Sequence, residues 1–175
     1  FQSRGPASPN PYMVGLWIGN GHVADAIITQ RDPEVITYCQ AFAPKLGLEC
    51  RVKDDPRNNT KTISIRVPGR GHRGTPNVFR NYVLSHCVQE GEKVLPTSLQ
   101  VASTLERLEL LAGLLDSDGY YGNGYYEITT KYAGLADQIL FVARSLGFAA
   151  YKTTKRATIK QTGFVGFYWR IQISG

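Results

Sequence analysis

Apolar residues recur along the chain with two different spacings. Between Pro33 and Gly47 they lie three or four positions apart, which predicts an amphipathic helix that begins at the proline and ends at the glycine. The stretches 48–53 and 61–67 are typical of strands, and the segment 54–59 between them is rich in turn residues. This part of the chain therefore predicts a helix followed by two strands.

The same order of elements recurs later in the chain. Residues 134–146 predict a helix, and its apolar positions repeat those of the first helix at an offset of 100. Strands are predicted at 149–155 and 164–174, and the segment 169–173 overlays 63–67 at an offset of 106. The offset between the two halves increases from 100 to 106 along the chain. We attribute this increase to small insertions in loops, as expected after an internal duplication.

Flanking segments complete each half. We expect strands at 25–31 and 125–131, and a helix at about 77–89 that follows a Gly-rich basic loop at 69–74.

The final strand of each half separates an apolar face from a polar one. In 164–174, Tyr168, Arg170 and Gln172 alternate with large apolar residues, and in 61–67 the polar positions include Arg66. The polar face falls on equivalent positions in both halves. An ordinary solvated sheet face would show the same alternation, so the pattern by itself assigns no function.

The stretch 110–119 reads Leu-Leu-Ala-Gly-Leu-Leu-Asp-Ser-Asp-Gly and is typical of a helix that ends at Gly119. Asp116 and Asp118 lie in its last turn, at the negative end of the helix dipole, where a carboxylate costs about 0.3–1 kcal/mol unless a cation is present. The stretch therefore points to a metal site, although, when it is taken alone, a buried helix with a polar cap is favoured over a catalytic site.

A second copy of this stretch lies near the start of the chain. The segment 13–21 overlays 111–119 at an offset of 98, and Asn20 stands at the place of Asp118. With these two motifs the sequence resembles the LAGLIDADG homing endonucleases in their single-chain form found in inteins, and in particular the endonuclease domain of vacuolar-ATPase-type inteins. The second motif is near-perfect, whereas the first is degenerate.

This resemblance covers nearly all of 12–175 and implies an α+β fold. The family fold is a duplicated αββαββα unit with pseudo-twofold symmetry, in which two antiparallel sheets form a saddle. We assign 1–11 to a linker or excision stub, 12–103 to the first repeat with its connecting helix, and 104–175 to the second repeat, which stops after its last strand. Two repeats in one chain imply a monomer.

The resemblance also implies the catalytic residues. Asp118 and Asn20 are expected to bind a divalent metal, Mg²⁺, that cleaves DNA. Lys93 lies in a Lys-Val-Leu-Pro stretch that resembles the Lys-x-Ile-Pro of intein endonucleases, and we assign it as a charge stabiliser or water-orienting group. The alternative interpretation is that Lys93 is a solvated lysine in a linker. The matching lysine of the second repeat would lie beyond Gly175.

We expect double-stranded DNA to be the partner, because polar and basic positions recur on the predicted sheets of both repeats. Arginine, lysine and glutamine on strands can contact phosphates and reach base edges in the major groove. The expected DNA-binding residues are Arg31, Arg51, Lys53, Arg66, Lys131, Lys152, Lys155, Tyr168, Arg170 and Gln172.

Composition agrees with these expectations but does not decide them. The formal net charge of +6 suits a polyanionic partner, although many proteins that bind no nucleic acid are equally basic. The sequence shows no long apolar run and no signal-peptide pattern, so we expect an intracellular protein, the nucleus included, that is neither secreted nor in a membrane. Three cysteines without a C-x-x-C pair favour core thiols over a disulfide framework or zinc site.

Two departures from the family pattern leave the function open. The chain lacks an N-terminal nucleophile and a terminal His-Asn pair, so it cannot splice by itself, and a splicing domain would belong to the parent chain. Asn20 replaces an acid, as a natural lesion or an engineered change. The chain is therefore either an endonuclease, active or impaired, or a binding-only protein of the same fold, such as a DNA binder or an RNA maturase. A basic domain without a nucleic-acid role ranks last.

Overall fold

A computed structural model describes residues 10–56, 58–69, 75–159 and 163–175. The predicted linker 1–11 and the basic loop 69–74 lie almost wholly outside the described residues. The elements follow the predicted duplicated order of helices and antiparallel strands, and the architecture is the mixed helix and sheet fold that the sequence predicted. In the part of the chain that is described, no helix is both long and apolar enough to cross a membrane.

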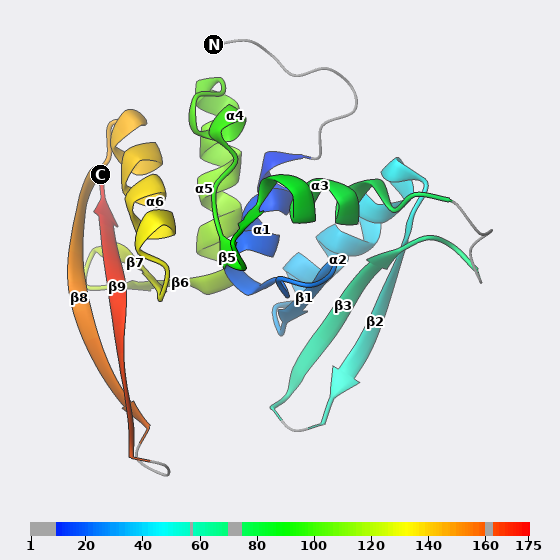
Figure 1. Cartoon of the computed structure of the whole chain (residues 1–175), viewed down its shortest axis with the longest axis horizontal. Helices are drawn as coiled ribbons and strands as arrows, with labels where there is room; N and C mark the ends of the chain where they lie inside the picture. Colours follow the sequence, from blue (N-terminus) through cyan, green and yellow to red (C-terminus); the bar gives the residue numbers. More distant parts are fainter. Residues whose placement is uncertain (1–9, 57, 70–74, 160–162) are drawn as a thin grey trace.

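Two helices pack side by side at the centre of the molecule, α1 (Pro11–Asn20) and α5 (Thr104–Asp118) (Figure 1). Each has a strong start signal. The side chain of Asn10 caps α1 ahead of Pro11, and α5 begins with a capping box in which Ser103 and Glu106 bond to each other's backbone N–H groups.

Glycines allow these two helices to approach closely. A Cβ atom on Gly15 would lie 2.3 Å from the carbonyl oxygen of Leu110, and one on Gly113 would lie 2.1 Å from that of Tyr12. These contacts are reciprocal at the same offset of 98 that aligns the two motifs. The helices are therefore related by the internal pseudo-twofold, and no larger residue fits at either glycine without separating them.

Each repeat builds one antiparallel sheet. The first has the order β1-β3-β2 and carries helix α2 on one face, and the second has the order β6-β7-β9-β8 and carries α6. Both sheets extend to the same side of the molecule, beyond the C-terminal ends of α1 and α5 (Figure 1). The elements of the first repeat are β1 (Ile27–Gln30), α2 (Pro33–Phe42), η1 (Ala43–Leu46), β2 (Glu49–Asp55) and β3 (Thr60–Arg66). Those of the second are β6 (Gly119–Gly122), β7 (Tyr125–Thr130), α6 (Ala133–Ser145), β8 (Ala149–Ile159) and β9 (Phe164–Ser174).

Strand register refines the internal alignment. Ile28 pairs with Ile63 in the first sheet, and Ile128 pairs with Ile171 in the second, so the last strands correspond at an offset of 108 rather than 106. Because the shift of two residues is even, it leaves every side chain on its predicted face. The isolated bridge between Gly21 and Ile28 is the first-repeat counterpart of the ladder that begins at Gly119 in β6, a strand that the sequence pattern missed.

The connection between the repeats differs from the prediction. Helix α3 (Val78–His86) ends before 89, and the chain then forms a hairpin of β4 (Val88–Gln89) and β5 (Glu92–Lys93). Glu90 and Gly91 take positive φ angles of 52° and 79°, the conformation that a tight two-residue hairpin turn requires. The short helix α4 (Thr97–Gln100), also not predicted, leads into α5.

Candidate active site

The C-terminal ends of α1 and α5 meet, and this brings the two motif residues together. Gly19 packs against Ser117, and the Nδ2 atom of Asn20 donates a hydrogen bond of 2.5 Å to the Ser117 carbonyl oxygen. A carbonyl oxygen can only accept, so the amide nitrogen of Asn20 must point toward it. Asn20 therefore caps the end of α5. Its amide satisfies the backbone carbonyl of Ser117, the residue before Asp118.

Lys93 is held at the same junction by the end of α1. Its ammonium donates to the carbonyl oxygens of Ile18 at 2.8 Å, Gly19 at 3.1 Å and Trp17 at 3.4 Å. Only 8% of the residue is exposed. A cation at this position complements the negative end of the helix dipole. Lys93 is thus a fixed, buried charge, and the alternative of a solvated linker lysine is wrong.

Lys93 and Asp118 line one small pocket of about 60 Å³ together with Gly19, Thr129 and Thr130. Burial lowers the pKa of Lys93 to about 8, although the nearby Asp118 carboxylate acts in the opposite direction. Burial also raises the pKa of Asp118 to about 6, and Lys93 partly offsets that rise. Asp118 as a whole residue remains exposed, so its carboxyl group is crowded by protein on one side and open on the other. Both groups therefore ionise closer to neutral pH than usual.

Asp116, the other acid of the second motif, lies away from this pocket. Asp116 accepts a hydrogen bond of 2.7 Å from the Tyr12 hydroxyl, and its backbone carbonyl accepts one of 3.2 Å from Gln30. Burial, and then this bond to Asp116, raises the pKa of Tyr12 well above its usual range. Asp116 ties α5 to α1, and it is absent from the residues that line the pocket.

The donor set at the junction fits a hard divalent cation in part. Asp118 offers carboxylate oxygens, and Mg²⁺ is usually held by one or two carboxylates together with water and substrate phosphates. Asn20 can offer only an amide oxygen, which carries no formal charge. No cluster of three or more His, Cys, Asp or Glu is found among the described residues. The protein would therefore hold such a metal through Asp118, with Asn20 as a weak second ligand.

The predicted basic residues of the first sheet share one face. Arg51, Lys53 and Arg66 lie opposite Ser64, Thr62 and Glu49 in the register, and such cross-strand partners point the same way. The other face holds the buried Ile63 and Ile65 and packs against α2. We call this exposed side the polar face of the first sheet. It carries Glu49, Arg51, Lys53, Thr62, Ser64 and Arg66.

The second sheet has a corresponding polar face, with one correction. Lys155, Tyr168, Arg170 and Gln172 lie on it as predicted, together with Glu127. Lys152 does not, because it lies opposite the buried Ile171 and its ammonium contacts Asp137 on α6 and the Trp169 ring. Lys152 and Lys155 are an odd number of residues apart in one strand, so they must point to opposite faces.

Arg31 and Lys131 occupy equivalent places just after β1 and β7 and are exposed. Lys131 lies close enough to Lys93 to lower its pKa further. Its chain neighbours Thr130 and Tyr132 line the pocket, so Lys131 lies beside the pocket.

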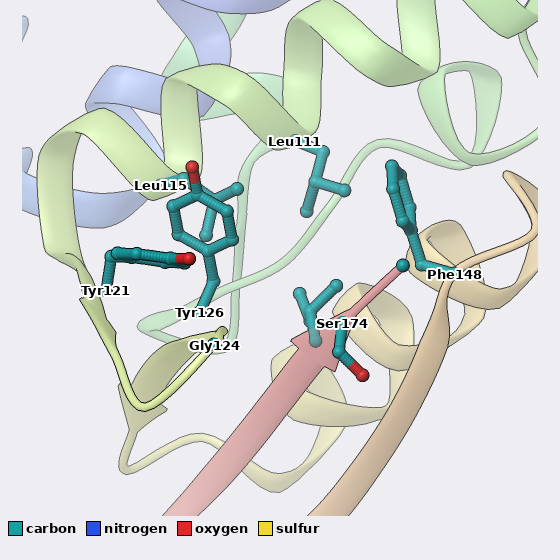
Figure 2. Close-up of a pocket in the computed structure, with 9 residues that line it drawn as sticks. Leu111, Leu115, Tyr121, Gly124, Tyr126, Phe148 and Ser174 are labelled. Atoms are coloured by element: carbon teal, nitrogen blue, oxygen red, sulfur yellow. The ribbon is translucent and has the colours of Figure 1, made fainter.

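A second, larger pocket of about 340 Å³ lies apart from this junction (Figure 2). It is lined by apolar side chains that include Leu115 of α5, Tyr126 of β7 and Phe148, and it reaches Gly175. None of the acidic or basic groups of the junction lines it. Trp17, the first-repeat counterpart of Leu115, is fully buried, so the two repeats differ in how this side of the central helices is covered.

Sequence reasoning missed several polar residues of the site. Gln30 is 7% exposed and holds the end of α5, and Glu127 pairs with two predicted DNA-binding residues. The signal for Glu127 was present, since it alternates with the apolar residues of its strand. Gln30 carries no such local signal, because its partner lies 86 positions away.

Two known proteins are similar in sequence to this chain over 83% of its length, and a family profile matches its second half. The profile of the homing endonuclease family matches residues 94–175. The homothallic switching endonuclease of Saccharomyces cerevisiae is 30% identical over 167 residues, which cover 83% of this chain and 28% of that protein. The replicative DNA helicase DnaB of Mycobacterium intracellulare is 31% identical over 147 residues, which cover 83% of this chain and 20% of the helicase. The chain thus spans less than a third of either relative.

Solved structures show the same fold. The homing endonuclease I-DmoI, in complex with DNA and Mn, gives a TM-score of 0.62 at 14% identity and covers 96% of this chain and 90% of its own. The N-terminal LAGLIDADG domain of WhiA gives 0.57 at 8% identity, over 98% and 80% of the two chains. The family profile over the second half of the chain, the sequence of the homothallic switching endonuclease and the shared fold all show that this chain is similar to the LAGLIDADG homing endonucleases.

Proposed function

We propose that this chain is the site-specific endonuclease domain of an intein-type protein. In this proposal it binds a long, asymmetric DNA duplex and hydrolyses it with Mg²⁺, and Asn20 impairs the cut that the first motif should make. One observation carries the proposal. Asp118, Asn20 and Lys93 meet at the adjoining ends of two motif helices, and a polar, basic sheet face extends from each side of that junction.

The two polar faces support a duplex partner. Each repeat would attend one half-site, and because the faces differ in their side chains, the target would be only loosely palindromic. Phosphate contacts would set the register, while arginine and glutamine side chains would reach base edges in the major groove. I-DmoI, which shares the fold, has been solved with its target DNA in the presence of divalent metals.

The residues at the junction suit phosphodiester hydrolysis. When bound, a divalent metal activates water and neutralises charge on the phosphate and the leaving oxygen. Asp118 is the carboxylate that would hold it. Lys93 cannot move freely, because three carbonyl oxygens fix its ammonium, so its role is to hold positive charge near the scissile phosphate or to orient a water.

Asn20 makes the two halves of the site unequal. Among the described hydrogen bonds, none runs from α1 to the Asp118 carboxylate. The amide of Asn20, in contrast, already donates to the Ser117 carbonyl oxygen. The side of the site that belongs to α1 therefore lacks one negative charge. We infer slow nicking of one strand rather than efficient double-strand cleavage.

The intein setting rests on the relatives. One segment of this chain matches both an endonuclease and a replicative helicase, and it accounts for only a fifth of the helicase. A module that occurs in proteins of such different activity behaves as an insertion within a host. The splicing segments would lie in the parent chain.

The test uses a supercoiled plasmid that carries a duplex selected by this protein from a long randomised library. With Mg²⁺, the protein is expected to yield nicked product slowly, and Asn20→Asp is expected to yield linear product. The double variant Asn20→Asp with Asp118→Asn is the control that should lose linear product. If Asn20→Asp binds the duplex but produces neither product, the chain is a binding-only member of the family.

That binding-only function is the second candidate, and the Asn20 hydrogen bond favours it. The amide serves there as a structural cap of α5, a role that needs no metal.

A further inference from the structure

The polar face of the second sheet holds an acid at the centre of its basic residues. Glu127 lies on β7 with a side chain that is 13% exposed. Its Oε1 atom is 2.7 Å from the Lys155 ammonium on β8, and its Oε2 atom is 3.3 Å from Nε of Arg170 on β9. One carboxylate thus joins a cation from the adjacent strand β9 to a cation from β8, the strand beyond it.

The first sheet has no acid at the equivalent position. Glu127 corresponds to Ile27, because each lies opposite the matching residue of the last strand, Gln172 or Ser64. The first polar face carries its acids at the two ends of β2, where Glu49 pairs with Arg66 and Asp55 lies opposite Thr60. The two repeats therefore share a fold but arrange their charges differently.

The ion pairs of Glu127 contribute only modestly to stability. Lys155 and Arg170 keep 37% and 32% of their side chains exposed, so solvent partly screens their pairing with the carboxylate. The Nε–H group of Arg170 is itself buried and, among the described residues, has no hydrogen-bond acceptor in good geometry. A buried donor without an acceptor is uncommon, and Glu127 therefore meets Arg170 through its charge rather than through a hydrogen bond at Nε.

A carboxylate on a DNA-facing surface also has an electrostatic cost. It repels phosphates and cancels charge that would otherwise raise general affinity for DNA. The carboxylate offsets this cost because it fixes the positions of a lysine and an arginine over the sheet. An arginine that is already oriented can meet the paired acceptors of a base edge, whereas a free one reaches the nearest phosphate.

We infer that Glu127 is a specificity-determining positioning residue of the second polar face. It holds Arg170 and Lys155 for base contacts and suppresses their binding to phosphates, so the half-site of the second repeat is read with greater discrimination than general charge would allow. This inference rests on the proposed function, because it assumes that the polar faces bind duplex DNA.

The experiment compares Glu127→Gln with the matched control Glu49→Gln, which removes the acid that pairs with an arginine on the first face. Each protein selects duplexes from the same long randomised library, and base preferences are read by sequencing. Arg170→Ala marks the half-site that the second repeat contacts. Affinity for a duplex of scrambled sequence is then measured against salt concentration.

Glu127→Gln should lower base preference at the second-repeat half-site by about tenfold, within the range of a single positioned base contact. It should also raise affinity for scrambled duplex, with a salt slope steeper by about 0.9 if one freed cation reaches a phosphate. Glu49→Gln should leave the preferences of that half-site unchanged.

Three outcomes would overturn the inference. They are unchanged preferences in Glu127→Gln, an equal rise in specific and scrambled binding, and the same loss in Glu49→Gln. If Glu127→Gln unfolds, Glu127→Asp replaces it, since the shorter acid keeps the charge but cannot span both cations; scrambled binding should stay constant while preference falls. A wild-type protein that enriches no sequence would instead contradict the proposed function.

Discussion

Replacing Asn20 by aspartate should make the metal-free protein less stable and make its stability depend on Mg²⁺. The substitution turns the donor of the 2.5 Å bond to the Ser117 carbonyl into an anion. Loss of the hydrogen bond costs about 0.5–1.5 kcal/mol, and a negative charge at the C-terminal end of α5 adds about 0.3–1 kcal/mol. Repulsion from the nearby Asp118 acts in the same direction. We therefore expect Asn20→Asp to lose about 2 kcal/mol of unfolding free energy.

Thermal unfolding in EDTA measures this loss, which corresponds to about 4–8 °C in Tm for a protein of this size. A metal that binds only the folded state restores stability by mass action, about 1.4 kcal/mol at ten times its Kd. Mg²⁺ should therefore raise the Tm of Asn20→Asp more than that of the wild type. Asn20→Leu is the control that removes the donor without adding charge, and it should lose about 1 kcal/mol with no added response to Mg²⁺. If Asn20→Asp is as stable as the wild type in EDTA, or if Mg²⁺ shifts both proteins equally, the assignment of Asn20 as a cap beside the metal site is wrong.

Three further changes test the junction and the central helices. Asp118→Asn should abolish residual nicking by the wild type while leaving affinity for the selected duplex nearly unchanged, and nicking that survives would place the metal elsewhere. The pKa of Lys93 is lowered to about 8 from 10.5, so between these pH values the unfolded chain keeps a proton that the folded chain has lost, and unfolding free energy should rise with pH by about 3 kcal/mol. Denaturant titrations should show this rise in the wild type and lack it in Lys93→Met, and parallel curves for the two proteins would contradict the buried ammonium. Gly113→Ala places a Cβ 2.1 Å from the Tyr12 carbonyl and should cost about 3 kcal/mol, whereas Gly134→Ala in α6, where nothing lies within 4 Å, should be neutral or stabilising; equal Tm values for these two variants would refute close packing of α1 on α5.

Local patterns predicted most of the fold. Helical spacing placed α2 and α6, and alternation placed β3 and β9 on the correct faces even though their offset was two residues short. An even error is harmless because side chains alternate with a period of two. The same rule would have placed Lys152 on the helix-covered face, had it been applied along β8. The end of α3 was missed because the turn at Glu90 and Gly91 interrupts a stretch whose composition still suits a helix.

The sequence by itself determined the duplication, the two motif helices and the identity of the motif residues, since each of these is a pattern of neighbouring positions. Tertiary structure decided what those residues do. Lys93 reaches the end of α1 across 75 positions, Asn20 reaches α5 across 97, and Glu127 meets Lys155 across 28. None of these contacts has a local signal, because each depends on which helix ends and strand faces the packing of the two repeats brings together. Periodicity is a property of one segment, whereas the charge and hydrogen bonding of the site arise between segments.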